Sequence, residues 1–186
     1  MGQKAFFFDM TRCSGCRCCQ VACKEAHDLP VGVFYRRVHE FEGGTFPHVW
    51  AASLSLGCNH CDDPQCVKNC PVAAQTKQAD TGLVLQDTEM CIGCKKCMAA
   101  CPYGAPSYNP VDDTVRKCDG CIALTSAGFQ PACVAACSTR ALRFGDVEQW
   151  DTSELAPLIT SDLVCLPDSS ITHPNVRILP KDEMRP

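Results

Sequence analysis

The stretch that decides the fold is C-I-G-C-K-K-C-M-A-A-C-P-Y-G-A-P, which runs from Cys91 to Pro106. Its four cysteines are separated by two, two and three residues, and a proline directly follows the last of them. Three side chains at this spacing fit on one tight, glycine-containing loop, where their sulfur atoms can surround a single centre. The fourth lies about one helical turn further on and is carried away toward a second centre. One run of this kind therefore predicts a neighbouring run.

Three further quartets of closely spaced cysteines accompany this run. The first repeats its spacing, the second also ends in Cys-Pro, and the fourth has an insertion between its second and third members. The four quartets are Cys13, Cys16, Cys19 and Cys23; Cys58, Cys61, Cys66 and Cys70; Cys91, Cys94, Cys97 and Cys101; and Cys118, Cys121, Cys133 and Cys137. This internal repeat is the main organisational feature of the chain.

Sixteen of the eighteen cysteines thus fall into quartets, which favours metal ligands over disulfides. The apolar run near the N-terminus stops at Asp9, so we expect no secretory signal and a reducing compartment during synthesis. Spacings of two, two and three residues before a proline are the ligand run of [4Fe–4S] clusters in bacterial ferredoxins. Zinc is the competing metal, but four-cysteine zinc sites use two separated C-x2-C pairs. We therefore expect iron–sulfur clusters.

The ferredoxin pattern also predicts which cysteines share a cluster. In two-cluster ferredoxins the fourth cysteine of each run binds the cluster of the other run. Pairing the first quartet with the fourth, and the second with the third, predicts four [4Fe–4S] clusters. Cluster 1 takes Cys13, Cys16, Cys19 and Cys137; cluster 2 takes Cys118, Cys121, Cys133 and Cys23; cluster 3 takes Cys58, Cys61, Cys66 and Cys101; and cluster 4 takes Cys91, Cys94, Cys97 and Cys70. Exchange ties the paired runs together, so metal binding and folding should be one event.

The expected fold class is α+β, with two interleaved ferredoxin-like units that contain short strands, short helices and many loops. Loose alternation of apolar and polar residues around Gly43-Gly44 predicts a β-hairpin inserted between the quartets. The expected segments are 1–30 with 105–145 (an outer unit holding the first and fourth quartets), 31–57 (the hairpin insertion), 58–104 (an inner unit holding the second and third quartets) and 146–186 (a C-terminal tail that wraps the surface or a partner).

Local patterns predict further elements outside the ligand loops. Apolar runs predict strands, and a four-residue spacing of apolar side chains predicts helices. The expected elements are a buried strand over residues 5–8, a helix over 20–29 that Pro30 ends, a strand over 82–86, a short helix over 131–137, and a strand and turn over 142–146.

Several cysteines and histidines lie outside the quartet pattern. Cys18 has the wrong spacing to its neighbours and is interpreted as a non-ligand, and the isolated Cys165 as a structural thiol. His39 and His48 could bind metal, but the quartets need no further ligand, so surface or packing roles are favoured. His60 lies between two ligands. It either donates a hydrogen bond to a cluster sulfur, which would raise the reduction potential, or is exposed to solvent.

The sequence predicts an electron carrier without a catalytic site of its own. The quartets leave no open ligand position, and there is no nucleophile with a base, no P-loop and no dinucleotide fingerprint. Saturated clusters in series conduct single electrons, so substrate chemistry would belong to another subunit. A formal net charge of −4, which thiolate ligands make more negative, argues against nucleic acid as a partner. No stretch approaches ~18 consecutive apolar residues, so we expect no membrane span.

With the quartets, several other stretches resemble the four-cluster iron–sulfur subunits of the molybdopterin oxidoreductase family, and most of all those of the dimethyl sulfoxide reductase branch. These stretches are F-F-F-D (6–9), F-Y-R-R-V-H-E-F-E-G-G (34–44), S-L-G-C-N-H-C-D-D-P-Q-C (55–66), R-K-C-D-G-C (116–121) and H-P-N-V-R-I-L-P (173–180). The resemblance implies an assembly in which a molybdopterin-containing catalytic subunit reduces the acceptor and an integral-membrane anchor oxidises quinol. This chain would relay electrons between them.

The resemblance also implies a location and leaves rival functions open. The complex would lie peripherally on the cytoplasmic membrane, exported with a partner that bears a twin-arginine signal, with the cytoplasmic face as the alternative. The same relay could serve a thiosulfate, polysulfide, tetrathionate, arsenate, formate or catechol-type molybdoenzyme. A stand-alone polyferredoxin carrier is a further alternative, against which the 31–57 insertion and the long tail argue.

Overall fold

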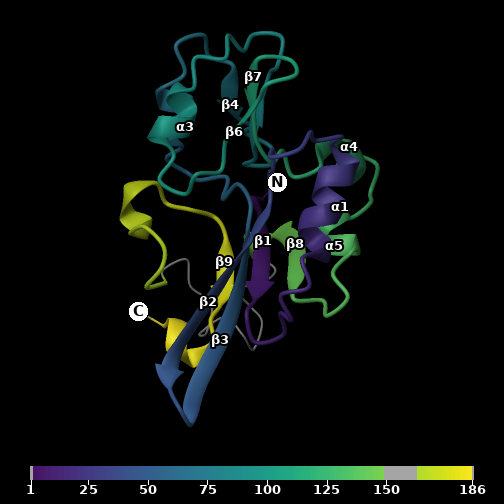
Figure 1. Cartoon of the computed structure of the whole chain (residues 1–186). Coiled ribbons are helices and arrows are strands. Elements are labelled where there is room, and N and C mark those ends of the chain that lie inside the picture. The colour runs from purple at the N-terminus through teal and green to yellow at the C-terminus, as the bar shows by residue number, and fades with distance from the viewer. Residues whose placement is uncertain (1, 149–162, 186) are drawn as a thin grey trace.

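The computed structural model of the chain describes residues 2–148 and 163–185 (Figure 1). These residues form a small mixed structure of short helices and short strands joined by loops. Strand β1 (Lys4–Asp9) is the central strand of a three-stranded sheet. Strand β8 (Leu142–Asp146) pairs with β1 in antiparallel orientation, with Phe8 opposite Leu142. Both strands were predicted from their apolar runs.

The third strand of this sheet comes from the C-terminal segment and was not predicted. Strand β9 (Arg177–Leu179) pairs with β1 in parallel orientation. It is only three residues long and lies between Pro174 and Pro180, so its sequence has too few residues to show a strand period. The last part of the chain therefore helps to build the sheet that also contains the first strand.

The predicted hairpin is present and is the longest strand pair. Strand β2 (Arg37–Thr45) pairs with β3 (His48–Leu56), with Arg37 opposite Leu56 and a two-residue turn at the tip. Only the base of β3 is buried, through residues such as Leu54. Figure 1 shows the hairpin projecting away from the helices. Two three-residue strand pairs complete the sheets described: β4 (Gln75–Lys77) with β5 (Val84–Gln86), and β6 (Ser107–Asn109) with β7 (Thr114–Arg116).

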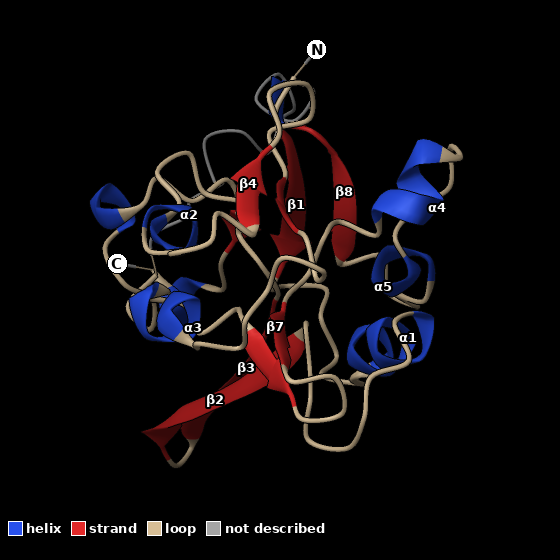
Figure 2. Cartoon of the chain, turned by 90° about the horizontal axis from the view of Figure 1, so that it is seen from above, coloured by secondary structure: helices blue, strands red, loops and turns tan. Residues whose placement is uncertain are grey.

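The α-helices gather in two places, one on either side of the strands (Figure 2). On one side lie α2 (Gln65–Lys68) and α3 (Lys96–Ala100), which pack against each other. On the other lie α1 (Cys18–Ala26), α4 (Ile122–Ser126) and α5 (Ala132–Ala135), and α1 packs against α5. Single 3₁₀ turns follow at Ser169–Ile171 and Asp182–Met184.

The helix predicted over 20–29 is shifted toward the N-terminus, and the strand predicted over 82–86 is shorter. Helix α1 begins at Cys18, after Arg17 in the left-handed conformation (φ 61°), and ends at Ala26. Asp28 is also left-handed (φ 46°), so the chain leaves the helix before Pro30. Strand β5 begins only at Val84. The short helix predicted over 131–137 corresponds to α5.

Two apolar cores hold these elements together. The larger one joins β1, β8 and β9 through residues such as Phe8, Leu142 and Ile178. The smaller one consists of Cys66, Val84, Cys97 and Val115. Cysteine side chains contribute to both, as small apolar groups do in other cores. The cysteine-rich loops are therefore part of the packed interior.

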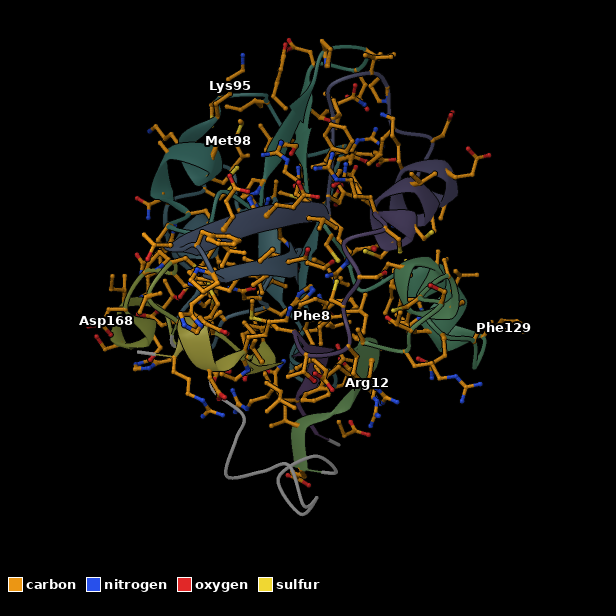
Figure 3. All side chains as sticks on the ribbon, turned by 60° about the horizontal axis from the view of Figure 1, so that its bottom comes forward. Phe8, Arg12, Lys95, Met98, Phe129 and Asp168 are labelled. Carbon is orange, nitrogen blue, oxygen red and sulfur yellow. The ribbon has the colours of Figure 1, made fainter. Side chains whose placement is uncertain are left out.

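Phe8 and Phe129 give a matched pair for testing the larger core. Figure 3 shows Phe8 inside the molecule and Phe129 projecting from its edge; their exposed fractions are 2% and 66%. We expect Phe8→Ala to lower the free energy of unfolding by about 3–5 kcal/mol because it leaves a cavity. Phe129→Ala should change it by no more than about 0.5 kcal/mol. Anaerobic denaturation followed by circular dichroism measures both. Equal effects would contradict the assignment of β1 as the centre of the core.

Candidate metal centres

The ligand loops share a C-x-G-C backbone in three of the four quartets. Gly15, Gly93 and Gly120 precede the second cysteine of their loops, and all three are left-handed, with φ of 71°, 64° and 74°. Glycine adopts this conformation without a steric penalty, and it lets the loop bend sharply. At Gly93 space is also limiting, because a Cβ atom there would lie 2.4 Å from the carbonyl oxygen of Asp113. In the second quartet His60 holds the same position, with φ 46°.

In the inner part of the chain, cysteines from the second and third quartets line two cavities together. Group 3, as we call it, consists of the cysteines that line the first cavity: Cys58, Cys61, Cys66 and Cys101. Group 4 lines the second: Cys70, Cys91, Cys94 and Cys97. Each cavity thus combines three cysteines of one quartet with the last cysteine of the other.

The first and fourth quartets intermix in the same way, as their electrostatics show. Burial raises the pKa of Cys13, and the thiolates of Cys19, Cys137 and Cys16 raise it further. These four form group 1. Burial also raises the pKa of Cys23, and the thiolates of Cys118, Cys133 and Cys121 raise it further. These four cysteines form group 2. Each group therefore contains four sulfur atoms close enough to repel one another when ionised. That these sulfurs bind iron stays a prediction.

Exposure differs sharply between the four groups. All the cysteines of group 2 are buried, as are Cys58 and Cys66 of group 3. Group 1 contains the exposed Cys16, and group 4 contains the exposed Cys94. Groups 2 and 3 thus contain no exposed cysteine, whereas groups 1 and 4 each contain one cysteine that reaches the surface.

The remaining cysteines are Cys18 and Cys165, and the thiol of Cys18 lies beside that of Cys16 in group 1. Cys18 is exposed at the start of α1. Cys165 is partly buried and packs against the larger core. Their interpretation as non-ligand and structural thiol stays a prediction. The hairpin carries two histidines, His39 on β2 and His48 on β3. Both are exposed and neither lies among the cysteine groups, which fits a surface role.

A fully buried arginine lies between groups 1 and 2. Arg36 is 2% exposed, and its Nη1 donates to the carbonyl oxygen of Ser55 over 3.0 Å. Its Nε and Nη2 atoms have no hydrogen-bond partner among the described residues. Burial disfavours the charge, but thiolates of both groups raise the pKa of Arg36; these are Cys133, Cys118, Cys19 and Cys23. A buried cation with unpaired N–H groups is suited to a site that carries concentrated negative charge.

Two interpretations of His60 were predicted, a hydrogen bond to a cluster sulfur and exposure to solvent. The second is wrong. The side chain is buried, with 1% of its surface exposed. The thiols of Cys58 and Cys118 are polar neighbours of the ring, and Nε2 has no hydrogen-bond partner among the described residues. Its Nδ1 accepts a hydrogen bond from the backbone N–H of Val84 in β5, which lies 24 residues further along the chain.

His27 also contacts a cysteine group, and the sequence did not single it out. Its Nε2 lies 3.5 Å from the Sγ atom of Cys121, 94 residues away, and 3.7 Å from a carboxylate oxygen of Asp119. The only sequence signal is its place just after the helix that carries Cys23. Because Cys121 belongs to group 2, His27 is part of that site.

The comparisons with known proteins agree on one family. The 4Fe-4S dicluster domain matches residues 50–147. A probable anaerobic dimethyl sulfoxide reductase chain of Escherichia coli (strain K12) is 42% identical over 197 residues, which covers 99% of this chain and 92% of the relative. A chain of the anaerobic dimethyl sulfoxide reductase of Haemophilus influenzae is 39% identical over 199 residues, covering 100% and 93%. A subunit of the sulfite dehydrogenase of Allochromatium vinosum is 38% identical over 173 residues, covering 82% and 72%.

The ligand loops offer a test that separates backbone strain from close contact. Gly93 and Gly104 have similar positive φ values, 64° and 61°, but a Cβ atom at Gly104 meets nothing within 4 Å. Gly104→Ala should therefore cost only the left-handed strain of about 1–2 kcal/mol. Gly93→Ala adds a clash with backbone and should in addition lower the iron bound per chain. Iron analysis of both purified variants measures this, and equal iron content would contradict the role given to Gly93.

Proposed function

Because this protein belongs to the family of 4Fe–4S dicluster proteins that includes a chain of anaerobic dimethyl sulfoxide reductase, we propose that it relays electrons through four [4Fe–4S] clusters. It is an electron-transfer subunit of an oxidoreductase complex. The finer statements that follow concern the number of clusters, their ligands and the partners.

The side chains of each group suit an iron–sulfur cluster. Four thiol sulfurs converge in each, and thiolates are the ligands that these clusters take. Groups 1 to 4 would hold clusters 1 to 4, and each cluster would then accept and pass on one electron. Buried N–H groups such as those of Arg36 fit an anionic cluster, since hydrogen bonds and charge near the sulfurs tune its potential.

The arrangement of the groups in series carries the proposal. Groups 1 and 2 share helix α1, which contains Cys19 and Cys23. Groups 2 and 3 meet at His60. Groups 3 and 4 share the second quartet, through Cys66 and Cys70. The order 1–2–3–4 places the exposed thiols of Cys16 and Cys94 at opposite ends, so electrons would enter at one end and leave at the other.

The proposed units follow the same pairing. An outer unit, residues 1–30 with 105–145, would contain clusters 1 and 2, and an inner unit, residues 58–104, clusters 3 and 4. The contacts of α1 with α5 and of α2 with α3 support this division. Insertion 31–57 would cover both units with its hairpin. Segment 146–186 would wrap around them, and β9 is the part of it that joins the sheet.

We assign the two ends of the relay to two partner subunits. One would be a molybdopterin-containing catalytic subunit that reduces a sulfoxide, and the other an integral-membrane anchor that oxidises quinol. The longest described helix, α1, has nine residues, and none of the described helices is long and apolar enough to cross a membrane. The complex would lie on the cytoplasmic membrane, exported with a partner that bears a twin-arginine signal.

A second candidate keeps the relay and changes the catalytic partner. The similarity to the sulfite dehydrogenase subunit over 82% of the chain favours it. A stand-alone carrier is less well supported. Such a carrier could take up and release electrons through one exposed cluster, whereas the series proposed here has an exposed cysteine at each end. The thiols that lie beside His27 and His60 would be cluster ligands, so the chemistry on substrate would fall to the partner.

Metal analysis of the native complex tests the relay. Four cubane clusters require about sixteen irons per chain. We expect that amount together with about one molybdenum in a protein that co-purifies anaerobically with the chain. About sixteen irons without a metal-bearing partner would favour a stand-alone carrier. Zinc in place of iron would overturn the cluster assignment.

Cysteine substitutions test which quartets share a cluster. If the fourth cysteines are exchanged, Cys101→Ala and Cys66→Ala remove the same electron paramagnetic resonance signal, because both belong to group 3. Cys97→Ala then removes a different one. If each quartet binds its own cluster, Cys101→Ala and Cys97→Ala act together instead. Cys18→Ala is the matched control and should leave the iron content and all signals unchanged.

A further inference from the structure

His60 occupies a backbone position that glycine holds in the other three ligand loops. The sequences are C-S-G-C, C-I-G-C and C-D-G-C there, and C-N-H-C here. With φ 46°, His60 adopts a conformation that is uncommon for a residue with a side chain. Strained residues of this kind persist where the surroundings hold them, often at functional sites. The loop would bend as well with glycine, so its shape alone gives no reason for an imidazole.

The hydrogen bonds of the ring fix the position of its proton. The backbone N–H of Val84 donates to Nδ1 over 3.0 Å. Since Nδ1 accepts this bond, the ring proton lies on Nε2, which makes Nε2 a donor. The hydrogen bond from Val84 keeps Nδ1 an acceptor. Nε2 itself has no partner that satisfies it among the described residues.

The two sulfurs beside the ring belong to different groups. Cys58 is part of group 3 and Cys118 is part of group 2. His60 therefore lies where the middle groups approach each other. Group 1 reaches His60 through none of the contacts described, and neither does group 4.

Lys117 also lies between groups 2 and 3, and we call this place, with His60, the junction of the two groups. It is buried, and its Nζ donates to the carbonyl oxygens of Val84 and Cys118. The same backbone residue, Val84, thus holds both Lys117 and the ring of His60. Positive charge and a donor are concentrated between two groups of thiolates.

The strained backbone of His60 is held by separate segments of the chain. Its carbonyl oxygen accepts hydrogen bonds from Nδ2 of Asn175 over 2.9 Å and from Nζ of Lys77 over 3.2 Å. The N–H of Asn175 also donates to the carbonyl oxygen of Asn59. The loop is therefore clamped, and the ring has no freedom to turn toward solvent.

We propose that, once the clusters are bound, His60 is a hydrogen-bond bridge between clusters 2 and 3, and that the buried and otherwise unpaired Nε2–H donates to the sulfurs of Cys58 and Cys118 as a shared donor. The inference rests on the proposed function, because it needs both clusters. A donor to a ligand sulfur stabilises the reduced cluster, so the bridge raises both potentials together. His60 is thus a positioning residue at the point where electrons cross between the two units.

Redox titration followed by electron paramagnetic resonance tests the bridge in the full chain. His60→Gly gives the loop the residue of the other three and removes the donor. We expect it to lower the equilibrium constant for reduction of clusters 2 and 3 about tenfold each, which lowers each reduction potential by about 59 mV for one electron. The potentials of clusters 1 and 4 should stay unchanged. His60→Gln keeps an N–H at a similar reach and should restore most of both shifts. His27→Leu is the matched control, because His27 contacts only Cys121 among the described cysteines, and it should shift cluster 2 alone.

The outcomes separate this proposal from the one on which it rests. Four signals with unchanged potentials in His60→Gly, or a shift of one potential only, would overturn the bridge and leave the relay intact. Fewer than four clusters in the unsubstituted chain would instead overturn the relay. Should His60→Gly not assemble, ¹⁵N-histidine labelling of the His27→Leu variant gives a direct reading by pulsed resonance. Nitrogen coupling on the signals of both middle clusters supports the bridge, and coupling on one or none overturns it.

Discussion

The constraint on which this structure depends is the mutual repulsion of thiolates that are held together inside the protein. Burial and neighbouring sulfurs oppose the ionisation of at least one cysteine in every group, and in group 3 they raise the pKa of Cys61 and Cys66 to about 11 and 12. A bound cation reverses this, because thiolates ionise outright when they coordinate metal. The polypeptide cannot supply the missing stability from its secondary structure. Helices of four or five residues such as α2 and α3 are far shorter than a helix that is stable alone. Ligand binding by the clusters would then supply folding free energy.

The same repulsion explains where the buried cations lie. Arg36 faces thiolates of groups 1 and 2, and Lys117 with His60 faces those of groups 2 and 3. Charge is thus compensated at the junctions between groups, where two clusters would approach. Burying an arginine without a carboxylate partner is costly elsewhere in a protein. Here the clusters themselves would serve as its partner, so these residues combine stabilisation with control of potential.

Local spacing in the sequence carried most of the information about the ligand loops. The cysteine intervals and the glycines before Cys16, Cys94 and Cys121 are short-range patterns, and the hairpin was visible from alternation around Gly43-Gly44. Features formed by distant segments were not visible. The hydrogen bond from Val84 to His60 spans 24 residues, and the approach of His27 to Cys121 spans 94 residues. Strand β9 forms only because β1 offers it an edge, with Asp9 opposite Leu179.

The segments without cysteine quartets can now be related to the centres. Asn175, from the C-terminal segment, holds the carbonyl oxygen of His60, while Ser55, at the end of the hairpin, accepts from Arg36 and lies 3.2 Å from the sulfur of Cys19. A ferredoxin-like unit of the proposed kind would need neither segment to bind its own two clusters. Two such units in one chain would, however, require a fixed geometry between them, because electron transfer depends on the separation and on the matched potentials of the centres. Asn175 and Ser55 hold His60 and Arg36, so we expect the hairpin and the C-terminal segment to fix the junctions between groups rather than the individual clusters.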